Sequence, residues 1–127
     1  MRGEKGTKAL PVEMIILKIL SEEDAYGYQI SQLIREYSDE TISIAEGSMY
    51  PVLYRMLDKG YISDYKKKVG RRMERVYYHI EQQGEEALQE LIVEYKKTTS
   101  GVLAILDHES SIVQGVQNEK WSSEKIL

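Results

Sequence analysis

The chain has 127 residues, of which 42% are hydrophobic and 30% are charged, and its formal net charge is -4. This length allows one compact domain with an appendage, and the composition excludes an intrinsically disordered chain. Because the chain has no cysteine, disulfides and thiolate metal sites are excluded. Its apolar runs are too short to cross a bilayer and its N-terminus lacks a signal-peptide pattern, so we expect a cytoplasmic protein without a membrane partner.

The first part of the chain predicts an arm followed by two helices. We expect residues 1–10 to form a flexible N-terminal arm. The stretch "LPVEMIILKIL" places Pro11 in a first turn before a dense apolar run, which predicts a helix over residues 11–20. Asp24 is the predicted N-cap of a second helix over residues 25–37, where apolar side chains recur on one face.

A third helix is predicted to end near Lys59, where "DKG" supplies a cation and a C-terminal glycine. Residues 38–46 before it have no helical period, and "TISIA" alternates as a short extended segment does. With Ser48 as the N-cap, Pro51 falls in the first turn, where its missing N–H costs nothing. An earlier start near Ala45 would place the proline deeper and require local distortion.

Residues 62–68 and 75–80 predict the two strands of a hairpin, because side chains of the second alternate between apolar and polar. The segment between them, "KKVGRRME", predicts a basic tip. Residues 47–80 hold eight Lys or Arg against three acidic residues, a net charge of +5, so the rest of the chain carries -9. A polyanion would encounter this local positive field, although on composition alone a solvated charged surface is the simpler explanation.

Residues 82–107 predict one long helix with a narrow apolar stripe whose spacing is close to 3.5 residues. A helix of this length cannot bury the whole stripe against so small a domain, so we expect part of it to contact a second copy. The predicted dimer-interface residues are Leu88, Leu91, Ile92, Tyr95, Thr99, Val102 and Leu106. Residues 108–127 have no clear period and are expected to form a C-terminal tail.

The predicted fold class is mostly α with a small β hairpin. Three helices, a hairpin with a basic tip and a long helix follow the order of a winged helix-turn-helix domain with an appended dimerisation helix. We place that domain at residues 11–81 and the dimerisation helix at residues 82–107. In this arrangement the third helix enters the DNA major groove and the hairpin reaches the neighbouring backbone or minor groove.

Three motifs make the chain resemble the PadR-like transcriptional regulators: "AYGYQI" at 25–30, "GSMYPVLYRMLDKGYI" at 47–62 and "RVYYHIEQQGEEAL" at 75–88. They occur in the family's order and spacing, and the resemblance spans roughly residues 10–107. It implies the winged helix-turn-helix fold, a homodimer, a palindromic operator in double-stranded DNA and, in many members, sensing of a small-molecule effector.

The candidate DNA contacts lie on the third helix and on the hairpin. Arg55 is the strongest candidate on the helix, because arginine can bond both phosphate and guanine. Tyr50 could instead pack against the hairpin, and the arginines could be only a solvated tip. We expect Tyr26, Gly27 and Tyr28 to serve core packing. The full predicted set is Ser48, Tyr50, Tyr54, Arg55, Lys66, Lys67, Lys68, Arg71, Arg72 and Arg75.

Other kinds of site have weaker support in the sequence. Tyr95 and Trp121 are the candidate effector pocket, with core packing or anchoring of the tail as the alternative. The two histidines are far apart and have no cysteine partners, so no metal and no other cofactor is expected. Nucleotide-binding and hydrolase motifs are absent, so we expect no enzymatic activity.

The sequence therefore predicts a sequence-specific DNA-binding transcriptional regulator, namely a dimeric repressor released by a small-molecule effector. The alternative is a winged-helix protein-interaction module that does not bind DNA. The basic hairpin favours the first hypothesis, and the acidity of the whole chain keeps the second open.

Overall fold

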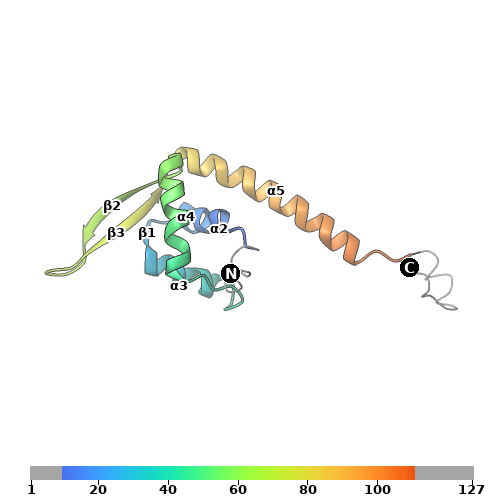
Figure 1. The fold of residues 1–127 in the computed structure, drawn as a ribbon, viewed down its shortest axis with the longest axis horizontal. Coiled ribbons are helices and arrows are strands. Elements are labelled where there is room, and N and C mark those ends of the chain that lie inside the picture. The colour runs from blue at the N-terminus through green and yellow to red at the C-terminus, as the bar shows by residue number, and fades with distance from the viewer. Residues whose placement is uncertain (1–9, 111–127) are drawn as a thin grey trace. The chain divides into compact units, whose positions relative to one another are not determined.

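The computed structural model describes residues 10–110, and within that range it has four helices and three strands (Figure 1). This confirms the predicted class, a mostly helical winged helix-turn-helix domain followed by a long helix. The elements are α2 (Val12–Glu22), β1 (Ala25–Tyr26), α3 (Gly27–Tyr37), α4 (Glu46–Lys59), β2 (Ile62–Lys68), β3 (Glu74–Ile80) and α5 (Gln82–Leu106).

The sheet has three antiparallel strands in the order β1-β3-β2, so the prediction of a hairpin alone missed its third strand. The hairpin of β2 and β3, hereafter the wing, pairs Ile62 with Ile80 at its base and Lys68 with Glu74 near its tip. Strand β1 adds two pairs on the other edge of β3, Ala25 with Tyr78 and Tyr26 with Tyr77. The wing is thereby joined to the helical part of the domain.

The pairing of β1 explains why the second predicted helix begins later than expected. Residues 25 and 26 are extended, so α3 starts at Gly27 and Tyr26 takes the N-cap position. The side chain of Gln29 accepts a hydrogen bond from the Tyr26 backbone N–H at 3.4 Å. The prediction of Asp24 as the N-cap is therefore wrong.

The segment between α3 and α4 forms no strand, although "TISIA" alternates. It opens with two non-glycine residues in the left-handed region, Asp39 at φ 58° and Glu40 at φ 66°. Ile44 is buried, and its carbonyl accepts a hydrogen bond from the Ser31 hydroxyl at 3.2 Å. This side chain and this bond hold the segment against α3.

Helix α4 begins at Glu46, with Ala45 as the N-cap, which decides between the two predicted starts. Pro51 consequently lies inside the helix, where it removes one backbone hydrogen-bond donor. The helix ends as predicted at Lys59, because Gly60 adopts a left-handed φ of 79°. The Tyr61 backbone N–H then bonds the Met56 carbonyl at 3.0 Å, as in a glycine-terminated helix.

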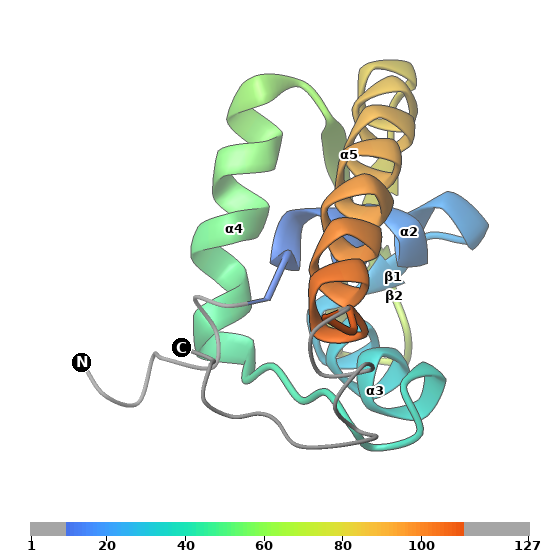
Figure 2. The ribbon, with the colours of Figure 1, turned by 90° about the vertical axis from the view of Figure 1, so that its right-hand side faces the viewer.

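The core is formed by the apolar faces of α2, α3 and α4 with the base of the wing. Helix α2 contacts α3, α4 and β3, and Figure 2 shows it crossing the domain beside α4. Ile16, Leu17, Leu53 and Met56 are fully buried between these elements. Burial of each such side chain contributes on the order of 1.5–3 kcal/mol.

Helix α5 is confirmed as one long helix, and the chain divides into two compact units between Ile92 and Val93. Leu88 is only 3% exposed and belongs to the core of the first unit. It is therefore buried within its own chain, whereas we predicted it to lie in the dimer interface.

Within residues 10–110 no helix is long and apolar enough to span a membrane.

Gly84 lets the first turn of α5 lie directly against the segment that follows α4. A Cβ atom at this position would overlap the carbonyl oxygen of Tyr61 and lie 2.9 Å from a side-chain carbon of Ile80. The same carbonyl accepts a hydrogen bond from the backbone N–H of Glu81 at 2.9 Å, so it cannot move away freely. The absence of a side chain at position 84 is thus required by packing.

We expect Gly84→Ala to lower the free energy of unfolding by about 1–3 kcal/mol, because the added methyl group forces the backbone apart. The helix propensity of alanine acts the other way by about 1 kcal/mol and does not offset the overlap. The matched control is Gly101→Ala in the same helix, where no atom lies within 4 Å of the added carbon. Urea unfolding compares the two variants, and equal stabilities would contradict this account.

Candidate nucleic-acid interface

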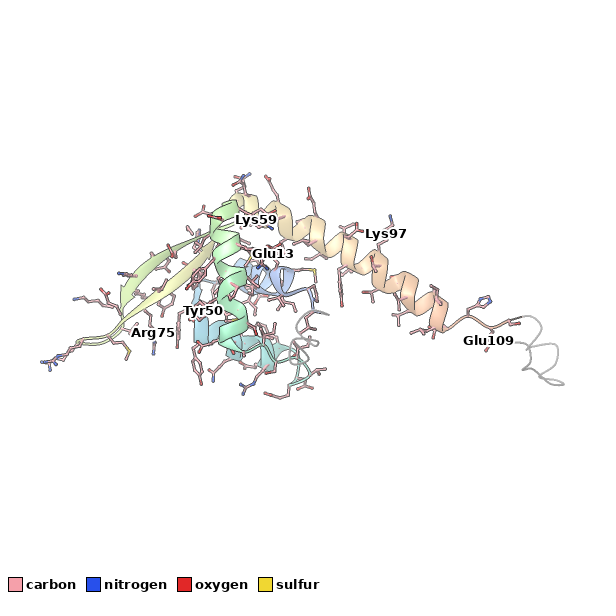
Figure 3. All side chains as sticks on the ribbon, viewed as in Figure 1. Glu13, Tyr50, Lys59, Arg75, Lys97 and Glu109 are labelled. Carbon is pink, nitrogen blue, oxygen red and sulfur yellow. The ribbon has the colours of Figure 1, made fainter. Side chains whose placement is uncertain are left out.

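The wing gathers the basic side chains that the sequence singled out. Lys66, Lys67 and Lys68 lie on β2 and are exposed, as are Arg71 and Arg72 in the turn between the strands. Arg75 is half-buried on β3, directly opposite Lys67 in the register, and Figure 3 labels it on the wing. The antiparallel pairing therefore brings six cations onto one hairpin.

Aromatic rings hold two of these cations in place. The Arg75 guanidinium carbon lies 4.3 Å from the centroid of the Tyr26 ring, and Lys67 Nζ lies 5.0 Å from that of Tyr77. The Tyr77 ring itself stacks on Tyr65 at 5.8 Å, with an interplanar angle of 16°. Such contacts restrict the side chains while leaving their charges free to act on an anion.

Helix α4 exposes its predicted contact residues to different degrees. Tyr54 is 60% exposed and Arg55 is exposed, while Ser48 is half-buried. Tyr50 packs against Gly27, the first residue of α3. A Cβ atom added at Gly27 would overlap the Tyr50 hydroxyl. Of the predicted contacts on this helix, Tyr54 and Arg55 are thus the ones most open to a partner.

Lys59, at the end of α4, has a structural role instead. Its Nζ forms an ion pair with Glu13 at 3.1 Å and lies 5.2 Å from the centroid of the Tyr61 ring. Figure 3 shows Lys59 and Glu13 together at the junction of α4 with α2. This pair ties the two helices and takes one cation out of the basic surface.

The residues predicted to serve core packing near the start of α3 behave differently from one another. Gly27 is buried and Tyr26 is half-buried beneath Arg75. Tyr28 is 54% exposed, so the prediction that it packs in the core is wrong. Its hydroxyl accepts a hydrogen bond from the Gln32 side chain at 2.9 Å.

Asp24 joins the body of the domain to both strands of the wing. Its Oδ2 accepts a hydrogen bond from the Tyr65 hydroxyl at 2.7 Å, and its Oδ1 lies 2.8 Å from Nδ1 of His79. Sequence reasoning missed this cluster, because its three members lie far apart in the chain. An acidic residue just before a helical period resembles an N-cap whatever its real partners are.

The Asp24 cluster changes the protonation of two of its members. Burial raises the pKa of Asp24, but hydrogen bonds from Tyr65 and His79 and the charges of His79 and Lys67 together lower it. The bond to Asp24 raises the pKa of His79, and burial only partly opposes that effect. Each group thereby stabilises the charged form of the other.

The predicted dimer stripe is only partly available to a second copy. Leu91 and Ile92 are half-buried against the core, and Thr99 is half-buried. Tyr95, Val102 and Leu106 are exposed, together with Leu103 and Ile105.

The candidate effector residue Trp121 lies outside residues 10–110. Within that range no group of three or more His, Asp or Glu side chains could hold a metal ion.

Comparisons with known proteins find similar sequences and structures. The model of the family described as the transcriptional regulator PadR-like family matches residues 16–90. The structure of a PadR-like transcriptional regulator from Bacillus cereus is 31% identical, with a TM-score of 0.68, over 86% of this chain and 100% of that one. A transcriptional regulator from Clostridium thermocellum is 34% identical, with a TM-score of 0.66, over 80% of this chain and 88% of that one.

A more distant structure was solved with nucleic acid. It is that of Bacillus subtilis PadR in complex with operator DNA, which is 23% identical with a TM-score of 0.60. The similarity covers 65% of this chain and 46% of that one, and it shows a shared fold.

We expect the stability of the protein to fall as the pH rises above about 6.5, by an amount that depends on His79. Because the folded-state pKa of His79 is raised, its ion pair stabilises fully below the unfolded-state pKa and is lost as the pH rises through the folded-state pKa. His79→Asn should remove this decline. Since both partners are partly exposed, the effect should stay below about 1 kcal/mol.

Urea unfolding at about pH 6 and about pH 9 measures this difference. His108→Asn, which replaces the other histidine of the chain, is the control and should keep the wild-type decline. At the acid end the sign reverses, because the contribution of Asp24 is lost as the pH falls through its lowered pKa. A wild-type protein with the same pH slope as His79→Asn would contradict the proposed pair.

Proposed function

Because the chain belongs to the PadR-like family of transcriptional regulators, we propose that it is a sequence-specific DNA-binding protein that reads duplex DNA with α4 and the wing. The observation that carries this proposal is the concentration of positive charge on one hairpin of an otherwise acidic chain. The operator complex of Bacillus subtilis PadR, which shares the fold, supports the same use of the domain.

The wing supplies the contacts to phosphate. Arg71 and Arg72 are exposed in the turn, and each phosphate that they neutralise releases a condensed counterion. Arg75, supported by Tyr26, presents its guanidinium closer to the body of the domain. These contacts set the position of the protein on the duplex and carry little sequence information.

Helix α4 supplies the reading of bases. Arg55 can bond the two acceptor atoms of guanine in the major groove, and Tyr54 can contact a base edge or a phosphate. Both side chains are exposed on the same half of the helix. Ser48 and Tyr50 are less exposed and fix the approach of the helix more than the choice of base.

The second unit of the chain supplies dimerisation. Val102, Leu103, Ile105 and Leu106 are at least half exposed on α5, and an exposed apolar cluster of this kind marks an interaction surface. A second copy covers it in our proposal. Two recognition helices related by a two-fold axis then address half-sites of a palindromic operator about 34–36 Å apart.

Regulation follows from occupancy of a promoter. The dimer acts as a repressor by covering the site, and an effector releases it by binding the DNA-free state more tightly than the DNA-bound state. Tyr95, which is 46% exposed on α5, remains a candidate effector contact. Its predicted partner Trp121 lies outside the described residues.

We expect the double substitution Arg71→Ala, Arg72→Ala to change the slope of log K for DNA binding against log salt concentration. The slope should become shallower by about two, because two phosphate contacts are lost. The matched control replaces Lys96 and Lys97 with alanine, which changes the net charge equally on α5. Fluorescence anisotropy with duplex from the region upstream of the gene and a scrambled duplex, at several salt concentrations, measures both slopes.

Three outcomes separate the hypotheses. A slope that falls only for the arginine pair supports the wing as a phosphate-binding surface. Equal slopes for both double variants would show that the wing lies outside the DNA interface. Weak binding that is blind to sequence in the wild type would favour the protein-interaction module instead.

We expect Val102→Glu to raise the dimer dissociation constant at least about tenfold, because it places a charge in an apolar interface. The control is Val93→Glu, since Val93 is also exposed on α5 but lies outside the predicted stripe. Sedimentation velocity over a range of protein concentrations measures both constants. A dimer that tolerates Val102→Glu as well as Val93→Glu would place the interface elsewhere.

A further inference from the structure

One carboxylate connects both strands of the wing to the body of the domain. Asp24 lies between α2 and β1, and its two oxygen atoms have different partners. Oδ2 accepts a hydrogen bond from the Tyr65 hydroxyl on β2 at 2.7 Å, and Oδ1 lies 2.8 Å from Nδ1 of His79 on β3. Within residues 10–110 these are the only side-chain hydrogen bonds between a wing strand and the part of the chain before α4. Loss of this one carboxylate would remove both.

The register of the wing explains how a single side chain reaches two strands. Tyr65 pairs with Tyr77 and His79 pairs with Ser63, so Tyr65 and His79 lie diagonally across the hairpin on the same face. The Asp24 side chain is 33% exposed, so its bonds form partly away from water. Hydrogen bonds to an ionised carboxylate are also stronger than those between neutral groups.

The outer part of the wing has little other backbone support. Strand β1 pairs with β3 only at Ala25 and Tyr26. From the pair of Lys66 with Val76 to the turn, the hairpin has no third strand beside it. A two-stranded hairpin is marginally stable in water, so the orientation of its outer part depends on the contacts that restrain its base.

The orientation of the wing matters for the two arginines in its turn. Arg71 and Arg72 are exposed and are the proposed phosphate contacts. A site that is held in its bound geometry avoids the cost of being ordered on binding. A hairpin that samples several orientations can bind for only a fraction of the time, and its apparent affinity falls by that fraction.

The charge of Asp24 by itself opposes DNA binding. Burial acts to raise its pKa, but the hydrogen bonds from Tyr65 and His79 and the charges of His79 and Lys67 lower it. The carboxylate is thus ionised within electrostatic reach of the basic wing, where a negative charge weakens the field that attracts a polyanion. Any favourable effect of Asp24 on DNA binding must come from the geometry that it imposes.

We propose that Asp24 is a positioning residue for DNA binding, which holds the wing in the orientation in which Arg71 and Arg72 reach the duplex. This step rests on the proposed function and adds to it a residue outside the basic surface. Charge and geometry predict opposite changes in affinity when the carboxylate is removed. The sign of the change therefore tests the proposal.

The first test compares Asp24→Ala with the wild type by fluorescence anisotropy, with duplex from the region upstream of the gene. Asp24→Ala should weaken binding about fivefold, a size typical of coupling within one hydrogen-bond network, although it makes the wing more positive. The control is Asp64→Ala, because the exposed Asp64 carboxylate on β2 makes no hydrogen bond or ion pair within residues 10–110. This control should keep or raise the affinity. An Asp24→Ala variant that binds at least as tightly as the wild type would overturn the proposal.

The second test asks whether Asp24 acts through the arginines of the turn. In the Arg71→Ala, Arg72→Ala background, Asp24→Ala should cause no further loss, because the side chains that it positions are gone. An equal loss in both backgrounds would indicate general destabilisation and overturn the proposal.

Tyr65→Phe tests the same restraint without changing any charge. It should weaken binding about threefold, as expected for one lost hydrogen bond, and should have no effect in the Asp24→Ala background. Circular dichroism melting curves establish that each variant is folded. If Asp24→Ala does not fold, Tyr65→Phe keeps the ring that stacks on Tyr77 and carries the comparison of the two arginine backgrounds.

A third measurement uses no DNA. Because the chain has no cysteine, spin labels can be attached at Gly70→Cys in the turn of the wing and Glu36→Cys on α3, which are both exposed. Double electron–electron resonance, with labelled protein diluted in unlabelled protein, should show a broader distance distribution in Asp24→Ala than in the otherwise wild-type chain. Equal distributions would overturn the proposal.

Failure of the proposed function gives a different result. A wild type that binds no duplex would refute DNA reading by α4 and the wing, while the spin-label distances would still show whether Asp24 restrains the wing. A wild type that binds duplex and is not weakened by Asp24→Ala would keep the proposed function and refute the positioning role. The two failures are therefore distinguishable.

Discussion

The pairing of two residues of β1 with β3 is the constraint on which the arrangement of this domain depends. A two-stranded hairpin alone is marginally stable in water, and a third strand or a packed helix is needed to hold it. Ala25 and Tyr26 provide that third strand at the base of the wing. The same two residues end where α3 begins, so the wing and the helix-turn-helix share one fixed junction.

Several side chains of the candidate interface owe their positions to that junction. Tyr26 lies beneath Arg75 because β1 is next to β3 in the sheet. Asp24 immediately precedes β1 and thereby reaches Tyr65 and His79 on the two wing strands. Local backbone pairing thus arranges both the cation of the proposed interface and the polar cluster that stabilises its base.

The sequence was sufficient to predict the helices and strands whose signal is periodic and local. Helical spacing located α2, α4 and α5, and alternation located both wing strands to within one residue. Strand β1 has no such signal, because two residues cannot show a period and their partners lie more than fifty residues away. The start of α4 was ambiguous because Ser48 is a better intrinsic N-cap than Ala45, yet the helix begins directly after Ala45.

The candidate site was only partly visible from the sequence for the same physical reason. The cations of the wing follow from composition and alternation, so they could be named in advance. The contact of Tyr50 with Gly27, the exposure of Tyr28 and the burial of Leu88 depend on how separate elements pack. Residue type does not determine these features, and a tyrosine in particular suits a core, a surface or a cleft.

Because β1 is short, the outer part of the wing extends beyond the three-stranded part of the sheet. Beyond the pair of Tyr26 with Tyr77, the hairpin continues through three more pairs without a third strand. At about 3.3 Å per residue, the turn lies on the order of 10 Å beyond the pair of Tyr26 with Tyr77. A rotation of about 10° at the base would then displace the tip by about 2 Å, which exceeds the tolerance of a hydrogen bond to phosphate. A small rearrangement of the hydrogen bonds around Asp24, at the base of the wing, would therefore produce a larger displacement of Arg71 and Arg72.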